Sequence, residues 1–258
     1  MMKIDILTLF PEMFNEFLST SIIKRAIAKN AVEIHTSNIR DFTTDKNGRV
    51  DDYSVGGGAG LIMKCQPVLD CLKSVRKDNS YVVLLSPKGI KFNQKISHEL
   101  ALKDHLILIC GHYEGVDERI IDNVDIEISI GDYILTGGEL ASMVVADSVI
   151  RLLEGSISSS SIIEESFENE LLEYPQYALP REYEGKDIPD ILFSGNHIAI
   201  EKWRLKESLR LTSEKRPDLL SGRKLSKKEL KLMEEIKNGE ENPEWLKKAI
   251  QKADKFMK

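Results

Sequence analysis

One loop of the chain has a composition that suits a pocket for a flat ligand. Residues 129–143 read Ser-Ile-Gly-Asp-Tyr-Ile-Leu-Thr-Gly-Gly-Glu-Leu-Ala-Ser-Met. Apolar side chains beside three glycines allow bare backbone to approach a ligand closely, which is more typical of a pocket wall than of a surface loop. A strand-like apolar run at 124–128 precedes the loop, and a helix-like run at 142–153 follows it. The alternative is a buried turn that binds nothing.

Two more loops of this kind occur earlier in the chain. Ser-Pro-Lys-Gly at 86–89 follows a predicted strand at 81–85, and a glycine-bearing segment at 110–119 follows a predicted strand at 105–109. In open α/β sheets, ligands bind outside the carboxyl ends of the strands. Three such loops in succession therefore favour one composite ligand site over three unrelated turns.

The glycines do not match the common nucleotide-binding patterns. Gly56, Gly58 and Leu61 fail the dinucleotide pattern at its third position, and no strand directly precedes them. The phosphate-loop sequence Gly-Lys-Ser/Thr is also absent from the chain. A ligand without phosphates is therefore the simpler expectation.

The segments around the loops predict alternating strands and helices. Apolar and polar residues alternate at 4–9 and at 32–37, which is typical of strands. A helix is predicted to begin at Pro11, and its apolar face comprises Met13, Phe14, Phe17, Leu18, Ile22 and Ala26. Further helices are predicted at 66–76, 93–102 and 140–153. The alternation predicts an α/β fold with a mainly parallel sheet covered by helices on both faces.

The chain changes character after Gly155. Four consecutive serines at 158–161 are followed by acidic residues, and 171–189 holds three prolines without a clear period. Residues 155–175 are therefore interpreted as a flexible connector that becomes ordered only with substrate. Beyond Ile198 the pattern predicts helices alone, at about 198–211, 226–237 and 243–256.

The composition is that of an ordinary soluble chain, with 41% hydrophobic and 30% charged residues and no apolar run long enough for a membrane span. There is no sign of a secretory signal. The three cysteines (Cys65, Cys71 and Cys110) show neither disulfide nor zinc spacing, and no metal ligation by side chains is expected. A cytoplasmic protein is therefore predicted.

Charge is distributed unevenly along the chain. The formal net charge of −6 argues against a protein that grips nucleic acid by bulk charge. Residues 195–258 nevertheless carry 17 Lys and Arg against 11 Asp and Glu, so the remainder is strongly acidic. A basic C-terminal part on an acidic body is what an RNA-binding module attached to a catalytic domain would show, although charged surface helices give the same pattern.

Several strings, in order, resemble one family. They are Leu-Phe-Pro-Glu-Met-Phe at 9–14, the glycine run at 56–60, Leu-Phe-Ser-Gly-Asn-His at 192–197, Trp-Arg-Leu-Lys-Glu-Ser-Leu at 203–209 and Arg-Pro-Asp-Leu-Leu at 216–220, together with the three loops. The chain thereby resembles the bacterial tRNA (guanine-N1)-methyltransferases of the SPOUT superfamily. The resemblance implies a deep trefoil knot, which periodicity cannot reveal and which is rare among folds.

The resemblance also implies the organisation and the ligands. A knotted cofactor-binding domain would span 1–157, a connector 158–175, and a small all-helical tRNA-binding domain 176–258. S-adenosylmethionine, which has no phosphates, would be held by Leu84, Leu85, Ser86, Pro87, Gly111, Tyr113, Glu114, Ser129, Ile130, Gly131, Asp132, Tyr133, Ile134, Leu135, Gly137 and Gly138. The tRNA would contact Gly57, Gly58, Glu173, His197 and Arg204. The family's active site is shared between the two subunits of a homodimer.

By the same resemblance, the reaction would be methylation of N1 of guanosine 37, on the 3′ side of the tRNA anticodon. Such methylation needs a base for the N1 proton and a cation for charge that develops at O6. The positions that match the family's base and arginine are Glu165, before Ser166-Phe167, and Arg151. The family depends on Mg²⁺, yet the sequence holds no dedicated ligand cluster.

The chain departs from the family pattern at several positions. Glu165 and Glu173 stand where the family has aspartate, Leu179 replaces an arginine, and Ala141 replaces a proline. Tyr-Ser-Val at 53–55 stands in place of Arg-Pro-Tyr. These departures leave a second hypothesis open. It is a diverged paralogue that keeps the cofactor pocket but acts on another RNA position or binds RNA without turnover.

Overall fold

The computed structural model describes residues 1–157 and 165–256 of the chain. Two compact units are present, Met1–Ser159 and Ser160–Lys258, and each is described separately below. Residues 158–164 of the predicted connector lie outside the described residues. Among the described residues, no helix has both the length and the apolar character needed to cross a membrane.

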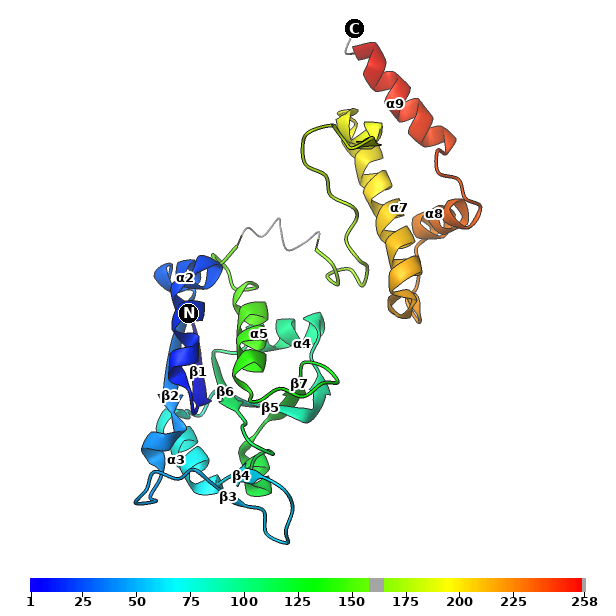
Figure 1. The fold of residues 1–258 in the computed structure, drawn as a ribbon. Helices are drawn as coiled ribbons and strands as arrows, with labels where there is room; N and C mark the ends of the chain where they lie inside the picture. The colour runs from blue at the N-terminus through cyan, green and yellow to red at the C-terminus, as the bar shows by residue number, and fades with distance from the viewer. Residues whose placement is uncertain (158–164, 257–258) are drawn as a thin grey trace. The chain divides into compact units, whose positions relative to one another are not determined.

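The first unit is built on a parallel five-stranded sheet, as the alternation of strands and helices predicted (Figure 1). Its strands are β1 Met2–Thr8, β2 Val32–Asn38, β5 Ser80–Lys91, β6 His105–Cys110 and β7 Ile126–Ser129. They lie in the order β2-β1-β6-β5-β7, and every neighbouring pair in this sheet is parallel. The carboxyl ends of β6, β5 and β7 are therefore neighbours at one edge of the sheet.

Helices cover both faces of this sheet. Successive side chains of a strand point to opposite faces, so Val82 and Leu84 enter one core cluster while Val83 and Leu85 enter the other. The cluster of Val83 includes buried residues of α2 Ser21–Ala28, α4 Gln94–Ala101 and α5 Glu139–Ile150, and that of Val82 includes residues of α3 Cys65–Val75. Burial on both faces explains why β6 is buried at every position.

The prediction of a single helix beginning at Pro11 is wrong, because the segment forms three shorter helices. It forms the 3-10 helix η1 Pro11–Phe14 and then α1 Asn15–Ser19, before α2 begins at Ser21. Thr20 is extended, and its hydroxyl donates a hydrogen bond of 2.7 Å to the carbonyl of Glu16. A side chain that bonds to the preceding turn in this way competes with continuation of the helix.

The first of the three predicted loops is not a separate loop, because β5 continues through it to Lys91. Leu85 and Ile90 both pair with Ile128 of β7, so residues 86–89 bulge out of the ladder. The strand pattern also missed the antiparallel pair β3 Asp51–Tyr53 and β4 Leu61–Met63, which flanks the glycine run at 56–60. The remaining short elements of this unit are the 3-10 helices η2 Ile39–Phe42 and η3 Glu118–Asn123.

The second unit holds three helices in its described part, α7 His197–Lys215, α8 Lys227–Lys237 and α9 Glu244–Phe256, close to the predicted ranges. It also contains a two-residue strand pair, β8 Glu182–Tyr183 with β9 Lys186–Asp187, which the expectation of an all-helical domain did not include. The 3-10 helices η4 Asp190–Phe193 and η5 Pro217–Leu220 complete it. Two small apolar clusters join the helices, one around Trp203 and one around Leu209.

Candidate functional site

The second and third predicted loops meet directly at the carboxyl edge of the sheet. The backbone N–H of Gly138 donates a hydrogen bond of 2.7 Å to the carbonyl of Gly111. One residue away, His112 forms an isolated antiparallel bridge with Gly137. The start of α5 is therefore fastened to the end of β6 by main-chain contacts.

Glycine is needed where these backbones touch. A Cβ atom on Gly138 would lie 2.8 Å from the Cα of Cys110 and 2.9 Å from the nitrogen of Gly111, both of them backbone atoms. A Cβ on Gly89 of the β5 bulge would lie 2.4 Å from the carbonyl carbon of Glu127. These approaches are closer than side chains allow, so the glycines let three chain segments converge at one place.

The third loop forms a tight turn around Gly131. The Ser129 hydroxyl donates to the carbonyl of Gly131 at 3.1 Å, and the N–H of Tyr133 donates to the same oxygen at 3.0 Å. Gly131 has a φ of +152°, and a Cβ there would lie 2.4 Å from Cε1 of Tyr133. Ile130 and Leu135 pack against the core, whereas the side chain of Ile134 is 80% exposed. The loop thus presents both a buried floor and an open rim.

The predicted cofactor residues also differ in their exposure to solvent. Those buried at the floor are Leu84, Leu85, Ser129 and Gly138. Those half-buried around it are Ser86, Gly111, Ile130, Gly131, Leu135 and Gly137. Those exposed at the rim are Pro87, Tyr113, Glu114, Asp132, Tyr133 and Ile134. The structure gathers them at the ends of three adjacent strands, and their contact with a cofactor stays a prediction.

Tyr113 occupies a conformation that is uncommon for its residue type. Its φ of +62° lies in the left-handed region, where a residue with a bulky side chain is rarely found. The Tyr113 ring meets the His112 ring edge-on at 4.9 Å, and the ring of Phe10 lies 5.2 Å from that of His112. Backbone strain of this kind clusters at binding sites.

Glu139 is a buried site residue that the sequence reasoning missed. Its side chain lies in the first turn of α5, where the positive end of the helix dipole favours a carboxylate, and the residue is only 3% exposed. Its Oε1 accepts a hydrogen bond of 2.8 Å from the hydroxyl of Thr8, at the end of β1. Burial, and secondly the charge of Glu139, raise the pKa of the Cys110 thiol. The signal available in the sequence was an acidic residue directly after the glycine pair.

The glycine-rich hairpin between β3 and β4 is attached to the second loop. The N–H of Glu114 donates to the carbonyl of Leu61 at 3.0 Å, and a Cβ on Gly60 would lie 2.4 Å from Cγ of Glu114. Gly57 and Gly58, predicted to contact substrate, lie exposed at the hairpin tip with positive φ, and a Cβ on either would meet no atom within 4 Å. The hairpin therefore brings an open backbone surface next to the second loop.

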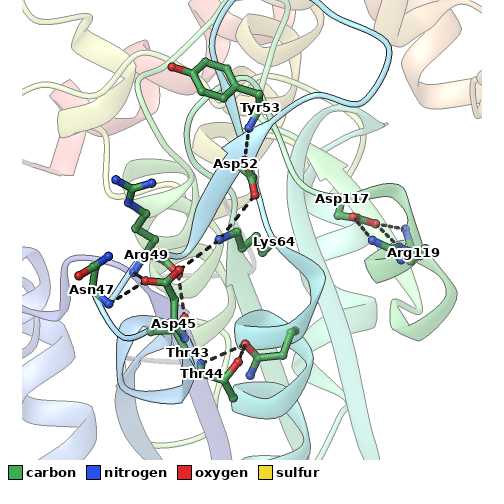
Figure 2. Close-up of polar contacts among 11 residues, drawn as sticks. Thr43, Thr44, Asp45, Asn47, Arg49, Asp52, Tyr53, Lys64, Asp117 and Arg119 are labelled. Carbon is green, nitrogen blue, oxygen red and sulfur yellow. Dashed lines mark hydrogen bonds and ion pairs between the residues drawn. The ribbon is translucent and has the colours of Figure 1, made fainter.

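Charged residues hold the base of this hairpin (Figure 2). Lys64 lies between two carboxylates, with its Nζ 3.9 Å from Asp45 and 3.7 Å from Asp52. The N–H of Asn47 donates to Asp45, and this bond lowers the pKa of that carboxyl group. Apart from the hairpin, in the second loop, Arg119 forms a two-bond pair with Asp117, and these hydrogen bonds lower the pKa of Asp117 (Figure 2).

The predicted substrate residues of the second unit lie on α7 and on the segment that packs against it. The Arg204 guanidinium lies 4.6 Å from the ring of Tyr174, the residue after Glu173. His197 is exposed at the start of α7, two helical turns before Arg204 and so on the same side of the helix. The side chain of Glu173 accepts a hydrogen bond from Gln176. His197 and Arg204 thus lie on one side of α7, and contact of Glu173, His197 and Arg204 with tRNA stays a prediction.

The two predicted catalytic residues belong to different units. Arg151 is the C-cap residue of α5 and is half-buried. Glu165 is half-buried and opens a turn in the second unit. Their roles, and their meeting at one substrate, stay predictions. No group of three or more His, Cys, Asp or Glu residues in the described part of the chain is arranged to hold a metal ion.

Comparison with known proteins identifies the family of the chain. The family profile described as tRNA (Guanine-1)-methyltransferase TrmD matches residues 2–222. A protein of Dictyoglomus turgidum named tRNA (guanine-N(1)-)-methyltransferase is 54% identical over 238 residues, which cover 92% of this chain and 97% of the relative. A protein of Bacillus cereus strain AH820 with the same name is 54% identical over 243 residues, covering 92% of this chain and all of the relative. The chain therefore belongs to the tRNA (guanine-1)-methyltransferase TrmD family.

Proposed function

We propose that the protein methylates N1 of guanosine 37 in tRNA with S-adenosylmethionine as methyl donor. The observation that carries this proposal is the convergence of three glycine-bearing segments, at β5, β6 and β7, in a chain that belongs to the TrmD family. The relatives' names specify the same transfer to guanine N1 in tRNA. The position in the tRNA rests on the family resemblance.

The chemistry of the site fits this cofactor. The three segments offer main chain and apolar side chains such as those of Ile130 and Leu135, and close backbone approaches occur at Gly89 and Gly138. No phosphate-binding pattern accompanies them, in keeping with a donor that has no phosphates. When bound, S-adenosylmethionine would supply a methyl group on a positively charged sulfur. Gly111, Tyr113, Ser129, Ile130, Gly131 and Leu135 would be among the residues that hold it.

In the proposed mechanism two residues act on guanine. The Glu165 carboxylate accepts the N1 proton as the bond from N1 to the methyl carbon forms and the bond from carbon to sulfur breaks. The Arg151 guanidinium meets the negative charge that moves towards O6. The glutamate side chain is one methylene longer than the family's aspartate, so the backbone of residue 165 must lie farther from N1 for the carboxylate to reach the same atom.

A homodimer, a trefoil knot and three domains at 1–157, 158–175 and 176–258 complete the proposal. Family membership supports all three. The dimer is further supported by α5, where Leu140 and Val144, one helical turn apart, are 50% and 47% exposed. Met13 of η1 is also exposed. Exposed apolar side chains of this kind favour contact with a second chain.

Magnesium dependence and action in the cytoplasm, where tRNA is processed, also remain part of the proposal. The family resemblance supports Mg²⁺, and the ion would be held through substrate and water as well as protein oxygens. Removal of Mg²⁺ with a chelator should then lower the methylation rate and leave the protein folded. Circular dichroism would report the fold in the same samples.

The diverged paralogue is the less favoured hypothesis. Identity of 54% over 92% of the chain with proteins named for guanine N1 transfer leaves little room for another RNA target. The deciding experiment is methyl transfer to tRNA transcripts that carry either guanosine or adenosine at position 37. We expect transfer to the guanosine transcript alone. Equal transfer to both, or none to either, would contradict the proposal.

A further inference from the structure

Residues 165–173, called here the base-bearing turn, are closed by hydrogen bonds between their own residues. The backbone N–H of Glu173 donates a hydrogen bond of 2.9 Å to the hydroxyl of Ser166. Inside this closure the N–H of Phe167 donates to the carbonyl of Leu171 at 2.8 Å. Glu165 directly precedes the closing residue Ser166, so its backbone position depends on the turn.

The base-bearing turn is attached to the helices at three points. Leu171 is 6% exposed and belongs to an apolar cluster with Leu209 and Leu232. The N–H of Leu172 donates to the hydroxyl oxygen of Thr212 on α7 at 2.9 Å. The Arg223 guanidinium donates to the carbonyl of Asn169 and pairs with Glu229 of α8 at 2.8 Å.

Thr212 is well prepared for this contact. It is fully buried in α7, and its hydroxyl donates to the carbonyl of Ser208 at 2.6 Å. The donated bond fixes the hydroxyl hydrogen, so a lone pair is left for the N–H of Leu172. Loss of this acceptor would leave a half-buried backbone donor without its partner, which is costly.

We infer that Thr212 and Arg223 are positioning residues for methyl transfer, because they make Glu165 part of the helical unit. The inference rests on the proposed function. The proposed base would then be carried by α7 and α8 as one body, and binding of tRNA to these helices would also place the carboxylate. Catalytic groups need such restraint, since a misplacement of about 1 Å costs roughly 100-fold in rate.

The test is single-turnover methylation of the guanosine 37 transcript by the full-length protein. Thr212→Val keeps the shape of the side chain and removes the acceptor, and we expect the rate to fall by about 10-fold or more. The affinity for tRNA should change little. Thr212→Ser keeps the hydroxyl and should restore most of the rate. Ser213→Ala is the matched control, because the Ser213 hydroxyl makes the same kind of bond within α7, to the carbonyl of Arg210.

A double variant separates positioning from general damage to the helix. If Thr212 acts through Glu165, then Thr212→Val should cause no further loss in a Glu165→Gln background. Additive losses would overturn the positioning role. Arg223→Met provides a second route should Thr212→Val fold poorly, since Arg223 precedes α8 and its replacement leaves the apolar cluster of Leu171 intact.

Hydrogen exchange gives a reading that does not depend on activity. The amides of Leu172 and Glu173 should be protected in the protein without tRNA, and Thr212→Val should remove that protection. Rapid exchange in the wild type would overturn the inference. If Glu165→Gln slows transfer but Thr212→Val leaves the rate unchanged, the positioning role alone is overturned. A Glu165→Gln enzyme with the wild-type rate would overturn the base assignment, and with it the reason for positioning.

Discussion

The hydroxyl of Thr8 donates a hydrogen bond of 2.8 Å to the carboxylate of Glu139, joining the end of β1 to the first turn of α5. Both residues are buried, and the same Thr8 oxygen accepts a bond of 2.9 Å from the N–H of Phe10. One hydroxyl thus connects the carboxyl edge of the sheet with α5, the helix that follows the third loop of the candidate cofactor site.

Replacing Thr8 should show how much this connection stabilises the first unit. Thr8→Val leaves a buried carboxylate short of one donor, so we expect the free energy of unfolding to fall by about 1–3 kcal/mol. Thr8→Ser retains the hydroxyl and should recover most of that loss. Urea denaturation followed by circular dichroism measures both. If Thr8→Val is as stable as the wild type, the bond contributes nothing to the fold.

The cofactor pocket can be tested at Gly131. Gly131→Val adds a side chain where Cε1 of Tyr133 lies 2.4 Å from the Cβ position, and it strains a backbone with φ of +152°. We expect calorimetric binding of S-adenosylhomocysteine to be lost. Gly155→Val is the control, since Gly155 also has a positive φ but no atom near its Cβ position. Equal affinity of Gly131→Val and wild type would exclude this pocket.

The general base can be tested at Glu165. Glu165→Gln keeps the shape and removes the basic carboxylate, so the transfer rate should fall by roughly 100-fold or more, while cofactor affinity holds. Arg151→Ala should also slow transfer, because the charge at O6 loses its partner. Glu165→Asp should give similar or lower activity if the longer side chain is compensated elsewhere. A gain in activity would mean that the glutamate has weakened an ancestral reaction.

The homodimer can be tested by light scattering. At micromolar concentration, the mass should be twice the 29.2 kDa of one chain. Leu140→Asp places a charge on the exposed apolar side of α5 and should yield monomers. Leu102→Asp is a matched control, because Leu102 is also exposed but lies at the end of α4. A wild type that runs only as a monomer would contradict the proposed shared active site.

Thiol reactivity should separate the three cysteines. Burial raises the pKa of Cys71 to about 12 and raises that of Cys110 as well, so both hold little of the reactive thiolate at pH 8. Cys65 is only half-buried. We therefore expect iodoacetamide to label Cys65 first in the native protein and all three in urea, with reactivity increasing as the pH rises. Rapid native labelling of Cys110, followed by mass spectrometry, would show that the end of β6 opens.

The sequence alone was sufficient to predict a mainly parallel sheet and the alternation of strands and helices along the chain that builds it. These strands are short apolar runs that end in glycine-bearing loops, and such runs can be recognised locally in the sequence. A parallel strand that is buried on both faces, such as β6, is apolar along nearly its whole length. The candidate cofactor residues could also be located from the sequence, because each motif that resembles the family is a contiguous stretch of the chain. The catalytic assignments of Glu165 and Arg151 came from the family resemblance.

Only the tertiary structure decided which distant residues meet. Thr8 and Glu139 are separated by 131 positions in the sequence, and no periodic pattern along the chain predicts their contact. The bulge at 86–89 depends on pairing with β7, which lies far from it in the sequence. The attachment of Leu172 to Thr212 likewise joins residues separated by an aperiodic segment. Local patterns specify elements, whereas close packing between elements specifies the site.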